Sequence, residues 1–178
     1  MLKLIGLAPT ACSIILDGHL RSLGARPSPH RCLATSHQSG QAVRVFESVP
    51  VRVVAAILRR DNRFLLCHRH PERAWYPDVW DLLGGHVEPG ETPTEALARE
   101  LRDELAVDLQ SLGLPFEEVA DSAAAVNVTI WLIDYAGAVV NHAPDEHDEL
   151  RWVTSDEIAG LALAHPSYVE LLGRAAHT

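Results

Sequence analysis

Residues 84–107 read "GGHVEPGETPTEALARELRDELAV", and the fold prediction depends on this stretch. It contains a helix start: Thr92 can cap the first turn, Pro93 suits the first helical position, and Glu95 completes a T-x-x-E capping box. Apolar residues then recur at every fourth position, which predicts a helix to about residue 105 with one face for packing on a sheet. These residues are Leu97, Leu101 and Leu105.

Three acidic residues occupy a different face of the same helix. Glu100, Asp103 and Glu104 follow the i, i+3, i+4 spacing, and like charges at that spacing repel by a few tenths of a kcal/mol per pair. A solvated acidic face is the usual explanation for such a cluster. Here a glycine pair at 84–85 also permits close approach of the backbone, and carboxylates with a carbonyl oxygen are the ligands that Mg²⁺ takes beside substrate phosphates. The stretch therefore indicates a site where a divalent cation, and then a phosphate, bridges the acids.

The stretch resembles the Nudix box, G-x5-E-x7-R-E-U-x-E-E-x-G-U, in which U is an apolar residue. The positions that agree in register are Gly85, Glu91, Arg99, Glu100, Leu101, Glu104 and Val107. The chain departs from the pattern at three places: Asp103 replaces a Glu, Ala106 replaces a Gly, and Leu83 stands where Pro is common. The resemblance covers roughly residues 50–175.

The resemblance implies an α+β fold, a Nudix-type α/β/α sandwich with a central mixed β-sheet, over residues 49–178. It also implies Mg²⁺-dependent hydrolysis of a nucleoside diphosphate linked to another group. Mn²⁺ is the alternative metal. The first expectation for the substrate is a nucleoside triphosphate, in the manner of MutT-like members. ADP-ribose, sugar nucleotides and dinucleoside polyphosphates remain alternatives, as does a nucleotide-binding regulatory module that has lost catalysis.

The resemblance assigns roles to individual residues. Those expected at the metal are Gly85, through its carbonyl, and Glu100, Asp103 and Glu104. Arg99 would orient Glu91. Attack on a pyrophosphate also requires a general base, and the candidates are Glu100 or a Glu from another loop, Glu146 or Glu149, which could equally be solvated loop acids.

Three residues at the end of the predicted strand 63–69 and in the loop after it are candidates for substrate binding. Trp75 and Tyr76 could stack on a nucleobase, although core packing is the more usual role of such aromatics. Arg69 could bind a phosphate, and a surface salt bridge is an equal alternative.

The remaining elements follow from composition and turn signals. Residues 51–60 and 63–69 read as strands of a hairpin joined at the Asp-Asn pair 61–62. Further strands are expected at 79–83, running into the glycine pair, at 125–137 and at 148–153, with 138–140 pairing back. Helices are expected at 154–161 and 166–176.

Composition limits the function. The net charge of −9 argues against non-specific binding to nucleic acid. Cys12, Cys32 and Cys67 are widely spaced and form no CxxC pair, which argues against a disulfide framework or a zinc site and fits a reducing compartment. No apolar run reaches the roughly 20 residues of a membrane span. A cytoplasmic enzyme with a nucleotide-derived substrate is expected, with a homodimer as an option.

The first 48 residues differ from the rest. They are net positive and rich in Ser, Gly, Pro and His, without periodicity, so the sequence predicts a disordered extension or a mis-assigned start. A weak secretory signal and an organellar transit peptide are the alternatives.

Overall fold

The computed structural model describes residues 31–33, 45–47, 49–122 and 124–178. The prediction for residues 1–48 lies almost wholly outside these residues. Within that segment, β1 (Arg31–Leu33) and β2 (Val45–Glu47) pair with each other in antiparallel fashion. None of the helices in the described ranges is long and apolar enough to cross a membrane.

The domain is organised around a seven-stranded mixed sheet with the order β5-β4-β3-β8-β7, in which β6 also pairs with β3 and β9 with β4. The β3–β8 pair is parallel and the other pairs are antiparallel. The strands are β3 (Val51–Arg60), β4 (Arg63–Arg69), β5 (Trp80–Asp81), β6 (Leu83–His86), β7 (Glu117–Asp121), β8 (Val126–Asp134) and β9 (His147–Val153).

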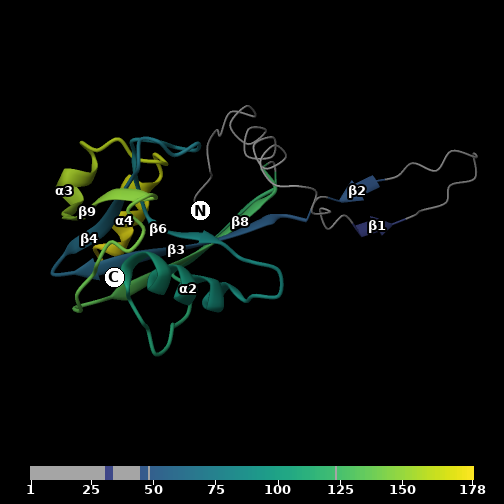
Figure 1. Ribbon diagram of the computed structural model, residues 1–178, viewed down its shortest axis with the longest axis horizontal. Helices are drawn as coiled ribbons and strands as arrows, with labels where there is room; N and C mark the ends of the chain where they lie inside the picture. The colour runs from purple at the N-terminus through teal and green to yellow at the C-terminus, as the bar shows by residue number, and fades with distance from the viewer. Residues whose placement is uncertain (1–30, 34–44, 48, 123) are drawn as a thin grey trace, which may run out of the picture.

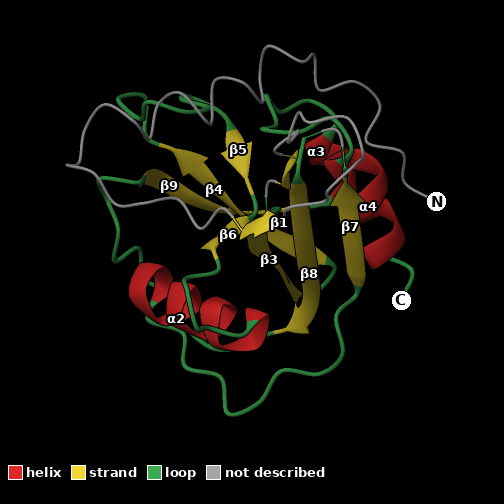
Figure 2. Ribbon diagram, turned by 90° about the vertical axis from the view of Figure 1, so that its right-hand side faces the viewer, coloured by secondary structure: helices red, strands yellow, loops and turns green. Residues whose placement is uncertain are grey.

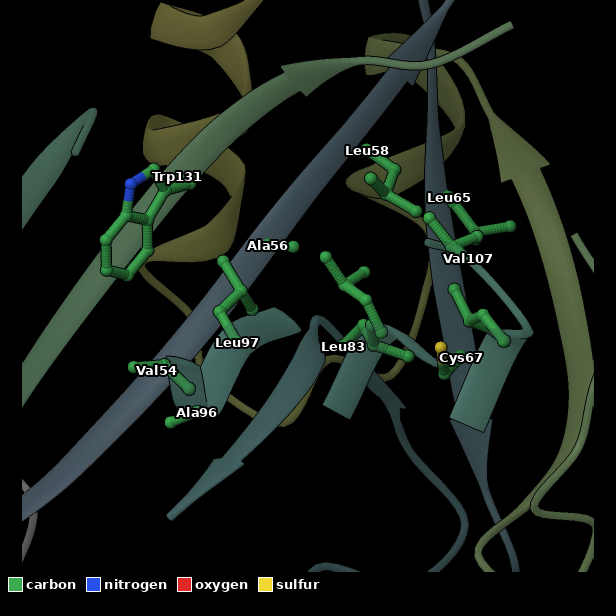
Figure 3. Close-up of a cluster of buried hydrophobic side chains, with 12 residues drawn as sticks. Val54, Ala56, Leu58, Leu65, Cys67, Leu83, Ala96, Leu97, Val107 and Trp131 are labelled. Atoms are coloured by element: carbon green, nitrogen blue, oxygen red, sulfur yellow. The ribbon is translucent and has the colours of Figure 1, made fainter. Parts of the chain in front are cut away.

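Helices cover both faces of this sheet (Figures 1 and 2). Helix α2 (Pro93–Leu105) lies on one face, while α3 (Ser155–Ile158) and α4 (Tyr168–Ala175) lie on the other. Alternation along β3 supplies both cores, because Val54 packs on the α2 side and Ala55 on the α3–α4 side. Figure 3 shows the α2-side cluster. The α+β prediction with a mixed sheet between helices is confirmed.

The hairpin and the α2 helix form as predicted. Asp61 and Asn62 both have positive φ, 50° and 60°, the conformation of a tight two-residue hairpin turn. At the start of α2, Thr92 and Glu95 form the reciprocal capping box, and Pro93 is the first helical residue. Local sequence signals were sufficient at both places.

Several boundaries differ from the prediction. The expected strand 79–83 is divided into β5 and β6, and the glycine pair lies inside β6 because Gly84 packs on β3, where a Cβ would lie 2.0 Å from the Val54 carbonyl oxygen. Strand β7 was not predicted. Residues 138–140 do not pair back, and the Val140 N–H instead donates to the Leu105 carbonyl at the end of α2. Helices α3 and α4 are shorter than expected.

Candidate active site

Arg99 links the loop before α2 to the acidic face of the helix. Its guanidinium donates to both carboxylate oxygens of Glu91, at 3.0 and 3.1 Å, and to Oε1 of Glu100 at 2.9 Å. It also donates to the His86 carbonyl at the end of β6, at 3.0 Å. The Arg99 hydrogen bonds are the main cause of the lowered pKa of Glu91. This is the arrangement that the family resemblance implied for Arg99 and Glu91.

Glu100 lies against the backbone of Gly85. A Cβ at Gly85 would sit 2.1 Å from Oε1 of Glu100, so a larger residue there would displace this carboxyl group from its present position. Burial is the main cause that raises the pKa of Glu100 from 4.5 to about 7; the Arg99 hydrogen bond lowers it, and the Glu104 charge raises it. Burial therefore makes the Glu100 carboxyl group costly to ionise, and the nearby Glu104 charge adds to that cost.

Glu104 is held by a residue at the start of β9. Its Oε2 lies 3.1 Å from Nε2 of His147, and the two side chains are only 8% and 5% exposed. The Nδ1 atom of His147 is buried and has no hydrogen-bond partner in the described part of the chain. The sequence singled out Glu104 and missed this partner.

Asp103 differs from its two acidic neighbours. It is exposed, and its side chain forms no hydrogen bond or ion pair with another described residue. Among the residues that the structure describes, no three His, Cys, Asp or Glu side chains form a ready group for a metal ion. The contacts explain this, because Arg99 engages Glu100 and His147 engages Glu104.

The carboxylates nevertheless fit a hard divalent cation. Two half-buried or buried acids lie one helical turn apart, and the backbone of Gly85 touches one of them. Burial first, and then repulsion by the Glu104 charge, raises the pKa of Glu100. A cation bound there would remove that repulsion, with oxygen ligands of the type that Mg²⁺ and Mn²⁺ accept.

Glu149 lies away from this acidic cluster. It pairs with His68 across the β4–β9 ladder, whereas the neighbouring pair, Cys67 and Leu150, belongs to the α2-side core. Successive residues of a strand face opposite sides, so Glu149 faces the α3–α4 side, where Arg151 lies 3.9 Å from it. This placement does not support Glu149 as the general base. Glu146 precedes β9 and forms a 3.0 Å ion pair with Arg73.

Arg69 organises the loop that carries the two aromatic candidates. Its Nε donates to the Tyr76 carbonyl and its Nη2 to the Trp75 carbonyl, both at 3.0 Å, while Nη1 lies 3.2 Å from Asp81. Trp75 is half-buried and Tyr76 is 39% exposed, with a left-handed φ of 48°. Direct phosphate binding by Arg69 stays a prediction, and the observed contacts show a role in holding the loop.

A separate groove of about 330 Å³ opens where α2 begins. Its walls come from the start of the helix and from β3, β7 and β8, and they include Arg52, Val87, Pro93, Glu118, Asn127 and Thr129. None of the acidic residues of α2 lines it, so the acidic cluster and this groove are distinct features.

Comparison with known proteins agrees with this geometry. A family model described as "NUDIX domain" matches residues 49–172. The chain is 35% identical over 128 residues to the CTP pyrophosphohydrolase of Escherichia coli (strain K12), a match that spans 68% of this chain and 88% of that protein.

Two solved structures are similar at the level of fold and sequence. The solution structure of the E. coli ORF135 protein gives a TM-score of 0.55 at 30% identity, over 69% of this chain and 86% of that one. The crystal structure of the MutT NUDIX hydrolase from Burkholderia pseudomallei gives 0.51 at 30% identity, over 60% and 84%. With a family match across most of its length and the motif residues gathered around α2, the chain belongs to the Nudix family and is a Nudix hydrolase.

Proposed function

We propose that this protein is a Mg²⁺-dependent pyrophosphohydrolase that converts a nucleoside triphosphate to the monophosphate and pyrophosphate. The observation that carries the proposal is the pair of interacting carboxyl groups of Glu100 and Glu104, of which Glu100 lies against the Gly85 backbone and has its pKa raised, mainly by burial. The similarity to a protein named CTP pyrophosphohydrolase, over 88% of its length, supports the choice of a nucleoside triphosphate.

Glu100, Glu104 and the Gly85 carbonyl would hold the metal, and Asp103 would join them from the exposed side. Mn²⁺ is the alternative metal. When bound, the cation neutralises the phosphoryl oxygens and lowers the pKa of a bound water. Asp103 is one methylene shorter than Glu and lies in solvent, so it contributes less to the site than Glu104 does.

The protein residues supply position and proton transfer. Arg99 fixes the Glu100 carboxyl group by a hydrogen bond to Oε1, and its two bonds to Glu91 hold the entry loop in place. Of the acids considered as the base, Glu100 lies in the acidic cluster, whereas Glu149 faces the α3–α4 side beside Arg151 and Glu146 pairs with Arg73. It is therefore the first candidate for the general base.

The loop from His70 to Val79 would hold the nucleoside part. Tyr76 is exposed there and Trp75 half-buried, and aromatic faces of this kind stack on nucleobases. Arg69 keeps both backbone positions fixed through their carbonyl oxygens. Of these residues, Tyr76 is the one with the surface available for stacking.

A substrate panel tests the proposal. Nucleoside triphosphates, ADP-ribose, a sugar nucleotide and a dinucleoside polyphosphate are incubated with and without Mg²⁺, and pyrophosphate and phosphate are measured separately. We expect Mg²⁺-dependent release of pyrophosphate from a triphosphate, with phosphate appearing only after added pyrophosphatase. Turnover of another class alone would replace the substrate assignment, and no turnover in Mg²⁺ or Mn²⁺ would favour a binding module.

Acidic variants test the metal residues in the same assay. Glu104→Gln removes one charge and little volume, and it should lower turnover by about 100-fold or more because charge neutralisation by the metal is lost. Asp103→Ala should cost much less than Glu104→Ala. If the two alanine variants lose equal amounts of turnover, Asp103 binds the metal as directly as Glu104 does. If Glu104→Gln retains wild-type turnover in Mg²⁺, the metal assignment is wrong.

A further inference from the structure

His147 is a buried polar residue that the proposed reaction does not use directly. Its imidazole is 5% exposed, and Nε2 lies 3.1 Å from Oε2 of Glu104. With Nε2 bonded to Glu104, Nδ1 is the other polar atom of the ring. Nδ1 is buried without a hydrogen-bond partner among the described residues. An apolar side chain would avoid that unsatisfied group, so packing alone does not explain a histidine here.

A shift in strand register brings His147 to Glu104. In the β4–β9 ladder Arg69 pairs with His147, but the next residue back, His68, pairs with Glu149, which makes Asp148 an extra residue. Asp148 instead lies 2.6 Å from Nδ1 of His68. Because faces alternate along a strand, an unshifted ladder would turn residue 147 away from α2.

The loop before β9 holds Glu104 at a second point. The His142 N–H donates to the Glu104 carbonyl at 2.8 Å, which satisfies a backbone group that the helix end leaves free. The side chain of Asn141 donates to the His147 carbonyl and accepts from the Ala143 N–H. Backbone and side chain of Glu104 are thus both fixed by residues 141–147.

We propose that His147 is a positioning residue for the metal site, which holds Oε2 of Glu104 so that Oε1 is free to bind the cation. The inference rests on the proposed metal role of Glu104. His147 contacts one carboxylate oxygen of Glu104, and the same carboxyl group interacts with Glu100, the other acid proposed to hold the metal. Partners of this type behind a metal ligand contribute about 10–100-fold to metal affinity.

The test compares His147→Leu, His147→Gln and the matched control His142→Ala. His142 is exposed on the same loop, and its backbone bond to Glu104 survives the substitution. Mn²⁺ binding is measured directly by electron paramagnetic resonance, Mg²⁺ dependence by titration of turnover, and folding by thermal melting.

We expect His147→Leu to melt somewhat below the wild-type temperature, because buried Glu104 loses its partner, but to stay folded and to need about 10–100-fold more metal for half-saturation in both titrations. His147→Gln should recover part of this loss, since its amide can donate to Oε2, and His142→Ala should match wild type. Equal Mn²⁺ affinity in wild type and His147→Leu would overturn the inference, as would a Gln variant no better than Leu. Absence of Mn²⁺ binding by the wild type would overturn it as well.

These outcomes separate the inference from the proposed function. If the wild type turns over a triphosphate and His147→Leu has unchanged metal dependence, the positioning role fails and the function stands. If Mn²⁺ affinity shifts as expected and no nucleotide is hydrolysed, the positioning role stands and the hydrolytic function fails.

Discussion

Glu100 combines several environmental effects in one side chain. It is 13% exposed, touches the Gly85 backbone, accepts a hydrogen bond from Arg99 and lies one helical turn from Glu104. Burial and the second acid favour its protonated form, while Arg99 favours its charged form. Ionising the Glu100 carboxyl group is therefore costly in the metal-free protein. A bound cation would favour the ionised form, so Glu100 is expected to lower stability without metal and to bind the metal when it is present.

This balance predicts a pH-dependent effect of Glu100→Gln on the metal-free protein. The folded pKa of about 7 exceeds the ordinary 4.5, so between these values the folded state binds the extra proton. The stability that Glu100 contributes is therefore present at low pH and is lost as pH rises through 7. The Gln variant does not titrate. We expect it to be more stable than wild type by about 1–2 kcal/mol at pH 8, after allowance for solvent screening, and by much less at pH 5.

Urea unfolding at both pH values in the presence of a chelator measures this difference. A second titration with Mg²⁺ at pH 8 should stabilise the wild type more than the variant. An advantage of Glu100→Gln that is the same at pH 5 and pH 8 would show that Glu100 is not the titrating group.

Ala106 shows strain at a single backbone position. It ends α2 with φ 55° and ψ 29°, the left-handed conformation, and its N–H donates to the Arg102 carbonyl at 3.1 Å. Ala106 stands where the family pattern has Gly, the residue that adopts this conformation without strain. The left-handed exit returns Val107 to the core, and the Val107 N–H bonds to the Leu101 carbonyl.

Ala106→Gly should therefore stabilise the protein. A left-handed Ala costs roughly 1–2 kcal/mol, and the extra freedom of Gly in the unfolded chain offsets part of the gain, so we expect a net increase of about 0.5–1 kcal/mol. The free energy of unfolding from urea titration is the measurement. Ala98→Gly, inside the same helix, is the matched control and should lose about 1 kcal/mol. Destabilisation by both substitutions would mean that Ala106 is not strained in solution.

At the scale of elements, local sequence patterns predicted α2 and the β3–β4 hairpin. The other strand boundaries depend on pairing between segments that are distant in the sequence. The capping box of α2 lies within four residues, and the hairpin turn within two, so short sequence windows were sufficient. The position of the glycine pair inside β6 depends on contact with β3, about thirty residues earlier. The loop after β4 likewise contacts the loop before β9, which is far away in the sequence: the His70 N–H donates to the Glu146 carbonyl at 2.8 Å.

The loop between β4 and β5 leads to a prediction about Arg69. The three guanidinium nitrogens of Arg69 contact the carbonyls of Trp75 and Tyr76 and the carboxylate of Asp81. This geometry needs a planar guanidinium group. If Arg69 acts by holding this loop, Arg69→Lys and Arg69→Gln should both raise KM by about 10-fold with little change in kcat, since uniform binding is lost.

Hydrogen exchange of residues 70–79 should increase in both Arg69 variants. The lysine variant separates the two hypotheses, because a simple phosphate contact needs only a positive charge in reach. Near-normal KM with Lys, together with a large increase with Gln, would assign Arg69 to the phosphate instead.

At the scale of the whole molecule, the site combines residues from β6, α2 and β9. The sequence predicted the residues of β6 and α2, which are close together in the chain, but not the contact with β9. The motif residues lie within about twenty positions of each other, so their chemistry was visible in the sequence. His147 lies 43 positions after Glu104, and its orientation depends on one extra residue in a strand ladder. No local pattern encodes that register, and for the same reason Glu149 was a candidate although it faces the opposite side.

The same view of the whole molecule predicts the effect of removing residues 1–48. The family match begins at residue 49, and the two core clusters of the described chain draw their residues from 54 to 176. Both faces of the sheet are covered by α2, α3 and α4, which lie within this range. The chain 49–178 should therefore melt within a few degrees of the full chain and keep its metal-dependent turnover. Calorimetry and the pyrophosphate assay on both proteins measure these two quantities.

A fall in melting temperature of more than about 10 °C would show that residues 1–48 contribute to the stability of the domain. Unchanged stability with lost turnover would show that they contribute to the active site.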